Sequence, residues 1–134
     1  MHCPDYSLRN SVATLALSVL TACATEVVRE PVTFSAQAPS TQPDYVVEAA
    51  IAVSSNSGYE RRVPAGSRWR LVGTIPQGDV YRRVDDVFSI EGAHMHEAFL
   101  VVAQGQLVGF YLPVEKSYSP ARSAVPIAVQ RRQQ

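Results

Sequence analysis

The sequence is poor in cysteine. Cys3 and Cys23 are the two cysteines among 134 residues, and both lie near the N-terminus. The chain after Cys23 therefore has no thiol, which excludes disulfides, thiolate nucleophiles and thiolate metal sites from that part of it. A folded domain there must be stabilised by its core alone.

The sequence also lacks an excess of charge of either sign. Twelve Lys and Arg balance twelve Asp and Glu, which argues against a nucleic-acid partner. There is no Gly-rich phosphate loop and no G-x-S-x-G motif. Asp85-Asp86 would point to opposite sides of an extended chain, so the pair predicts a turn rather than two cooperating carboxylates. We therefore predict a protein that is not an enzyme and has no cofactor.

A short apolar run over residues 12–20 ends at Leu20-Thr21-Ala22-Cys23. The run is far shorter than the roughly 20 residues that a membrane-spanning helix needs, and it suits a signal peptide. Together the run and the tetrapeptide resemble the signal peptide and lipobox of bacterial lipoproteins. The resemblance covers residues 1–23 only, and the rest of the chain is not similar to any family we recognise.

The resemblance implies that residues 1–22 are removed and that Cys23 carries a diacylglycerol thioether and an acyl chain such as palmitate. Ala24 and Thr25 follow instead of an early Asp, which in two-membrane bacteria implies the outer membrane, facing the periplasm. The implied partner is thus a membrane, reached through a lipid anchor.

The chain beyond Cys23 divides into three parts by composition. Residues 23–43 are rich in Pro, Ser, Thr and Gln, which predicts a flexible tether with an end-to-end distance of roughly 25 Å. Within it, Val27-Val28 and Val32-Thr33-Phe34 could instead add a strand to a partner or to the domain itself. Residues 44–116 form the predicted β-rich domain, and 117–134 read as a mostly irregular tail.

Apolar side chains alternate with period two over several stretches of residues 44–116. The pattern predicts strands over 45–53, 69–75, 80–84 and 87–90, and a hairpin of 98–103 and 107–112 joined by Gln104-Gly105-Gln106. We therefore predict an all-β, mainly antiparallel fold: a small barrel or two-layer sandwich of about five to seven strands.

Histidines offer the one candidate metal site. His94 and His96 would share a face of an extended segment and could reach one ion, with Glu115 or Asp79 as a further ligand. A polar loop with one histidine bonded to backbone is the favoured alternative, so metal binding is not expected.

Arginines next to aromatic residues offer candidate contacts for a partner: Trp69, Arg70, Tyr81 and Phe110. Arg82 and Arg83 would lie on opposite faces of one strand and so could not both contact one ligand. We predict a lipid-anchored cell-envelope protein with a structural, assembly or partner-binding role, such as a subunit of a secretion or transport machine with an envelope protein as partner. The alternative is an envelope ligand-binding module, for a metal at His94 and His96 or for a glycan at the Arg and aromatic surface.

Overall fold

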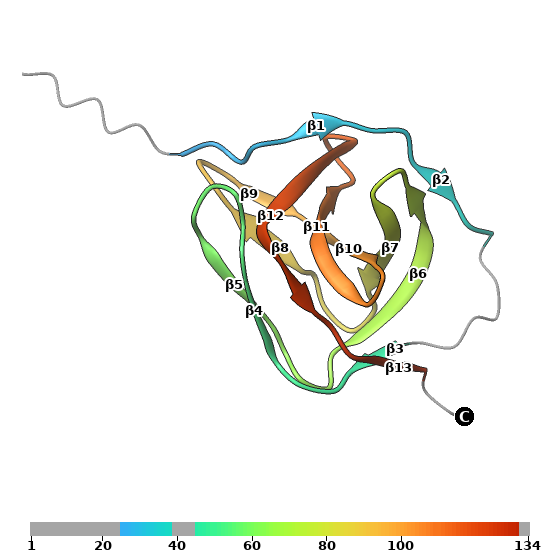
Figure 1. The fold of residues 1–134 in the computed structure, drawn as a ribbon. Helices are drawn as coiled ribbons and strands as arrows, with labels where there is room; N and C mark the ends of the chain where they lie inside the picture. The colour runs from blue at the N-terminus through green and yellow to red at the C-terminus, as the bar shows by residue number, and fades with distance from the viewer. Residues whose placement is uncertain (1–24, 39–44, 132–134) are drawn as a thin grey trace, which may run out of the picture.

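The computed structural model describes residues 25–38 and 45–131, and these form an antiparallel all-β fold (Figure 1). The part of the chain described contains no helix, and hence none that could cross a membrane. The strands are β1 (Glu30–Pro31), β2 (Ser35–Ala36), β3 (Tyr45–Val47), β4 (Ile51–Ser54), β5 (Glu60–Val63), β6 (Arg68–Ile75), β7 (Gly78–Arg83), β8 (Ser89–Glu91), β9 (Met95–Glu97), β10 (Phe99–Ala103), β11 (Gln106–Leu112), β12 (Ser117–Pro126) and β13 (Val129–Arg131).

Nine of these strands form the main sheet, in the order β1-β12-β11-β10-β7-β6-β3-β13, with β2 also paired to β6. Two separate hairpins, β4–β5 and β8–β9, complete the fold. The end strands β1 and β13 do not pair with each other within the described residues, so the sheet is not closed into a barrel. The prediction of an antiparallel all-β fold is confirmed, whereas closure into a small barrel and a count of five to seven strands were wrong.

The hairpin of β10 and β11 is the predicted one, at the predicted place. Its two-residue turn holds Gln104 and Gly105 at φ values of 52° and 72°. Positive φ at both turn positions matches the right-handed twist of the flanking strands, and this is why Gly is favoured there. The hairpin lies in the middle of the sheet, because β7 pairs with the free edge of β10 and β12 with that of β11.

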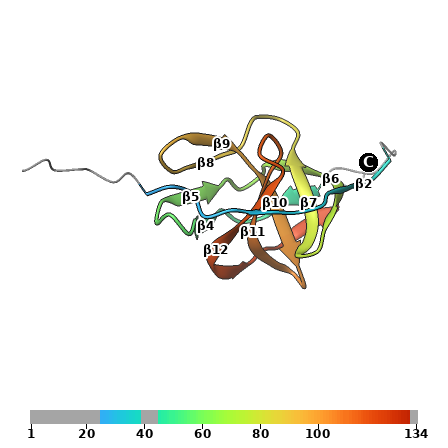
Figure 2. The ribbon, with the colours of Figure 1, turned by 90° about the horizontal axis from the view of Figure 1, so that it is seen from above.

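Each face of the main sheet carries its own apolar cluster. Successive residues alternate between them: Leu100 belongs to the larger, inner cluster and Val101 to the smaller, outer one. Trp69, Phe88 and Phe110 are buried in the inner cluster. The Phe88 ring contacts both the Trp69 ring and the Phe110 ring. The hairpins β4–β5 and β8–β9 supply further inner side chains, so they cover that face (Figure 2).

Residues 25–38, which we call the strap, cover part of the outer face. β1 pairs with β12 at one end, and β2 pairs with β6 at the other. Between them the Val32 amide donates to the Lys116 carbonyl at 3.2 Å, and the Phe34 ring stacks on Tyr111 with 4.9 Å between centroids. Over 25–38 the chain is therefore part of the domain rather than a flexible tether, which is the alternative that Val27-Val28 and Val32-Thr33-Phe34 left open.

The tail predicted to be mostly irregular also forms strands. β12 has ten residues, and its first three, Ser117, Tyr118 and Ser119, are buried. The proline-rich composition predicted irregular structure here, but proline is tolerated at sheet edges and bulges. β1 covers only the start of β12, and the register of β12 against β11 shifts between Leu107 and Gly109. The sheet therefore extends beyond the predicted limits of 44–116 at both ends.

Candidate functional site

The strap begins in a recess beside the β8–β9 hairpin. Val27 is only 2% exposed. A Cβ on Gly92, in the turn of that hairpin, would lie 2.4 Å from Val27 Cγ2 and 3.4 Å from the Thr25 carbonyl oxygen. Such a distance to Val27 is far below van der Waals contact, so the absence of a side chain at Gly92 makes room for the start of the strap.

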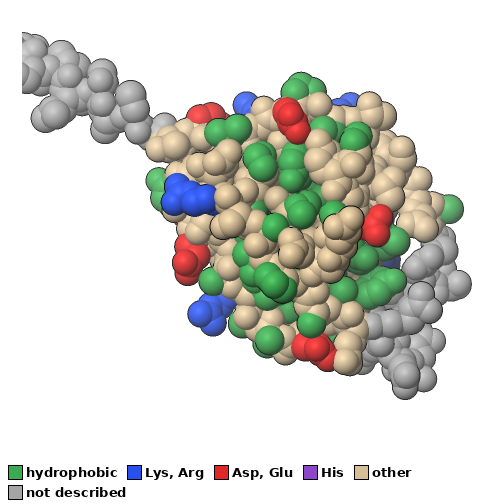
Figure 3. Space-filling view, in the orientation of Figure 1, with side chains coloured by type: hydrophobic (Ala, Val, Ile, Leu, Met, Phe, Trp, Pro, Cys, Tyr) green, Lys and Arg blue, Asp and Glu red, His purple; other side chains and the backbone are tan. Residues whose placement is uncertain are grey.

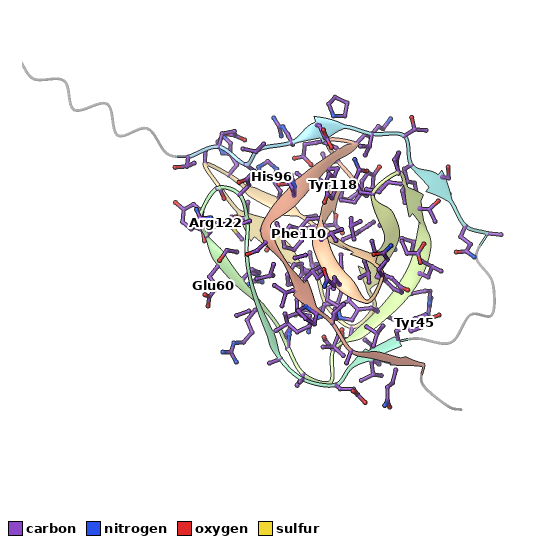
Figure 4. The ribbon with its side chains drawn as sticks, viewed as in Figure 1. Tyr45, Glu60, His96, Phe110, Tyr118 and Arg122 are labelled. Carbon is purple, nitrogen blue, oxygen red and sulfur yellow. The ribbon has the colours of Figure 1, made fainter. Side chains whose placement is uncertain are left out.

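A buried histidine, His96, lies close to the start of the strap (Figure 4). His96 Nδ1 is 2.6 Å from Glu115 Oε1, and His96 Nε2 is 3.8 Å from Glu26 Oε1 on the strap. Arg29, also on the strap, places Nη1 3.9 Å from the same Glu115 oxygen. Because an ionised carboxylate can only accept, Nδ1–H is assigned as the donor. The group thus links β9, the β11–β12 turn and the strap.

The environment of Glu115 favours its ionised form. Burial acts to raise its pKa, but the hydrogen bond from His96, a backbone hydrogen bond and the charges of His96 and Arg29 outweigh burial. The pKa of Glu115 is therefore lower than its usual value. This arrangement stabilises an ion pair under the strap and has the character of a structural clamp.

The two histidines do not act together as a metal site would require. His94 is exposed in the bend before β9, where its carbonyl accepts from the Gly92 amide at 3.0 Å. Because this segment is bent rather than extended, the expected shared face with His96 is absent. Asp79 lies on β7, paired with Val102. Within residues 25–38 and 45–131, no three side chains of metal-binding type gather closely enough to hold an ion.

Three of the four predicted partner-contact residues are in the core. Trp69 is 1% exposed and donates from Nε1 to Ser67 Oγ at 2.9 Å, while Phe110 is completely buried. Tyr81 is also buried, and burial, followed by the nearby Tyr45 and Asp79, raises its pKa to about 12. All three point into the inner cluster, so the prediction that they form a contact surface was wrong. Arg70 is exposed, as a contact residue should be.

Arg70 belongs to a shallow hollow on β6 and β7, which we call the arginine hollow. It has a volume of about 190 Å³ and is lined by Arg70, Val72, Arg82, Arg83 and Val84. Arg70 and Arg82 are directly opposite each other in the β6–β7 ladder. Two guanidinium groups side by side on neighbouring strands can donate hydrogen bonds to the same anion.

Arg82 and Arg83 therefore do border one site, contrary to the prediction from strand alternation. β7 ends at Arg83 and the chain bends at Val84, so alternation no longer separates the two residues. Arg83 Nε contacts Asp85 Oδ1 at 3.0 Å, and Arg83 Nη1 lies 3.9 Å from Asp86 Oδ2. The two aspartates thus offset part of the positive charge of the hollow.

The size of the hollow limits what it can bind. Pockets for drug-sized ligands have volumes of about 300–1,000 Å³, so this hollow suits a single carboxylate or phosphate group rather than a whole cofactor. Arginine is the side chain best suited to such planar or tetrahedral anions, because its guanidinium donates two parallel hydrogen bonds. Elsewhere, on the face in Figure 3, the charged side chains described are scattered among apolar ones.

Sequence reasoning named Arg70 but did not name Val72 beside it. The register of β6 against β7 shifts between Leu71 and Gly73, and the two faces of the strand exchange there: Leu71 packs against the inner cluster, whereas Ile75 belongs to the outer one. Cys23, the predicted lipid-attachment residue, lies outside the described residues. No family model matches the chain, and neither the curated proteins nor the solved structures contain a significant match.

Proposed function

We propose that this protein is a lipid-anchored cell-envelope protein that acts as a structural, assembly or partner-binding module. The anchor is Cys23, by resemblance to the lipobox, and the location is the periplasmic face of the outer membrane in a two-membrane bacterium. A subunit of a secretion or transport machine would need this combination of anchor and compact binding domain.

One observation carries the proposal: folded structure begins almost immediately after the proposed anchor. Thr25 is two residues after Cys23, and Val27 is already buried in the domain. A lipid on Cys23 would therefore hold the domain itself at the membrane, which suits a module that presents a surface to neighbouring envelope components.

The arginine hollow is the proposed contact surface. Arg70 and Arg82 would bind a carboxylate or phosphate group of the partner, with Val72 and Val84 packing against the apolar part beside it. An envelope glycan carrying acidic groups offers the same chemistry. It is the alternative ligand, now without the aromatic platform because Trp69 and Tyr81 are buried.

Lipid attachment is tested by expression of the full chain in a bacterium, followed by mass spectrometry of the mature N-terminus and fractionation of membranes. Cys23→Ser should abolish both acylation and membrane recovery. Cys3→Ser is the matched control, since it removes the other cysteine and should change neither. A Cys23→Ser protein that remains in the membrane fraction would contradict the anchor.

Partner binding is tested by cross-linking in intact cells, followed by affinity purification of the lipidated protein. Arg82→Ser should lose the cross-linked species, whereas Arg62→Ser, at an exposed arginine on β5, should retain it. Sensitivity of the captured material to protease distinguishes a protein from a glycan. Equal capture by both variants would contradict a role for the hollow.

A further inference from the structure

The position of the strap determines which end of the domain is nearest the proposed anchor. A residue spans at most about 3.6 Å of extended chain, so the Cys23 backbone lies within about 7 Å of Thr25. The Thr25 carbonyl in turn lies beside Gly92, at the turn of the β8–β9 hairpin. This inference rests on the proposed lipid anchor at Cys23.

Two hairpin turns meet at this end of the molecule. Ser57 Oγ, in the β4–β5 turn, donates to the Glu91 carbonyl at 3.1 Å, so the turns of β4–β5 and β8–β9 are in contact. Figure 2 shows both hairpins extending toward the end at which the strap begins, whereas β6 and β7 lie on the opposite side. We call the end formed by these two turns and the start of the strap the anchor end.

Exposed apolar side chains are present at the anchor end. Met95 follows the β8–β9 turn and is 63% exposed, Tyr59 ends the β4–β5 turn, and Val28 is on the strap next to buried Val27. Tyrosine suits the boundary between headgroups and acyl chains, because its ring is apolar and its hydroxyl is hydrated, and apolar side chains such as Met95 and Val28 can be buried beside it.

We propose that the anchor end lies against the phospholipid headgroups of the bilayer that holds Cys23, with Met95 and Tyr59 at the headgroup level. The short connection to Cys23 leaves little room for a different end to approach the membrane. The arginine hollow, on the opposite side, then faces the aqueous compartment and is accessible to a partner.

Charge limits how deep this contact is. Glu26, Glu60 and Glu91 are exposed at the same end, and Arg29 is partly exposed. Burying carboxylates in hydrocarbon is costly, so the acids hold the domain at the surface. The apolar side chains and the lipid, rather than a basic patch, are what attract this end to the membrane.

The test places an environment-sensitive fluorophore on the intact lipidated protein in vesicles of phosphatidylethanolamine and phosphatidylglycerol. Single cysteines are introduced by Met95→Cys and, as the matched control, Val87→Cys, because Val87 is 64% exposed and precedes β8 on the side away from the turn. The same variants carrying both Cys3→Ala and Cys23→Ala give the unlipidated reference with one thiol. Quenching by the neutral agent acrylamide reports access of solvent to each position.

We expect acrylamide quenching at position 95 to fall about twofold or more on vesicles, as for side chains in the headgroup region, with no change at position 87. Equal protection at both positions, or protection at neither while the protein floats with the vesicles, would overturn the orientation and leave the anchor intact. Failure of the Cys23 protein to float with the vesicles would overturn both the anchor and the orientation.

Discussion

Two parts of the outer face of the main sheet differ in what covers them. Over β11 and β12, Tyr111 and Tyr118 pack in an apolar cluster beneath Val32 and Phe34 of the strap. Over β6 and β7, the arginine hollow is open to solvent. The covered part is apolar, whereas the open part combines three arginines with Val72 and Val84, so the open part is the one available to a partner.

The strap that covers the first part should be more sensitive to mutation than the open hollow. The largest expected effect is at Val27, where the strap begins and its side chain enters the inner cluster. Val27→Ala removes two buried methyl groups at the start of the strap, which should lower the free energy of unfolding by about 2 kcal/mol. Val28→Ala, at the adjacent position that is 52% exposed, should change it by less than about 0.5 kcal/mol. Urea denaturation measures both, and equal effects would contradict a docked strap.

The histidines provide a second matched pair. His96→Ala removes the hydrogen-bond donor to Glu115 and leaves a partly buried carboxylate poorly satisfied, at a cost of about 1–2 kcal/mol. His94→Ala, at an exposed position in the bend, should have little effect on the denaturation midpoint. If the two variants were equally stable, the clamp beneath the strap would contribute nothing.

The same clamp predicts a dependence on acid. Because the pKa of Glu115 is depressed in the folded protein, the folded state binds fewer protons than the unfolded state below the usual value of 4.5. The stabilisation is therefore present above pH 4.5 and is lost as the pH falls through the folded pKa. Thermal denaturation at a series of pH values should show a shallower acid loss for Glu115→Gln than for the wild type.

Asp85, whose pKa is also lowered, serves as the control for that profile. Burial acts to raise the Asp85 pKa, but the hydrogen bond from Arg83, the backbone hydrogen bonds and the charge of Arg83 together outweigh it. Asp85→Asn should therefore also change the acid limb of the stability profile, but through the contact with Arg83, which lies outside the strap. If Glu115→Gln leaves the acid limb of the stability profile unchanged, the Glu115 carboxylate does not stabilise the contact with the strap.

The open part gives the smallest expected effect on stability. Arg82→Ser replaces an exposed side chain at the border of the hollow, so the free energy of unfolding should change by less than about 0.5 kcal/mol. A loss of more than about 1 kcal/mol, beyond what exposed substitutions cause, would mean that Arg82 supports the fold rather than a ligand.

Local patterns in the sequence predicted the parts of the fold that depend on neighbours in the chain. The β10–β11 hairpin is an example, because alternation and a Gly-containing turn act over a few residues. The strap was misread because β1 and β2 have two residues each and pair with β12 and β6, far away in sequence. Gly73 and Gly92, which make room for Phe34 and Val27, are ordinary glycines until the fold brings the strap to them.

In the candidate site, too, the sequence predicted local features and missed those that depend on distant residues. Arg70 is exposed as expected, since charge alone predicts exposure. The pairing of His96 with Glu115 joins residues 19 apart in sequence. The alternation of side chains along a strand does not show whether such a pair would bind a metal ion or stabilise the fold. Trp69 and Phe110 are buried because the β4–β5 and β8–β9 hairpins cover the inner face of the sheet, which the pattern of a single strand does not reveal.

Hydrogen exchange of the strap amides tests the central claim most directly. The Val32 amide donates to Lys116 and the Gln37 amide to Val72, at 3.2 and 2.9 Å. Both should exchange as slowly as amides in the early part of β12, because the strap is paired with the sheet. Exchange of both amides at the rate of an unstructured peptide would show that residues 25–38 are a tether, and the account of a domain held directly at its anchor would fail.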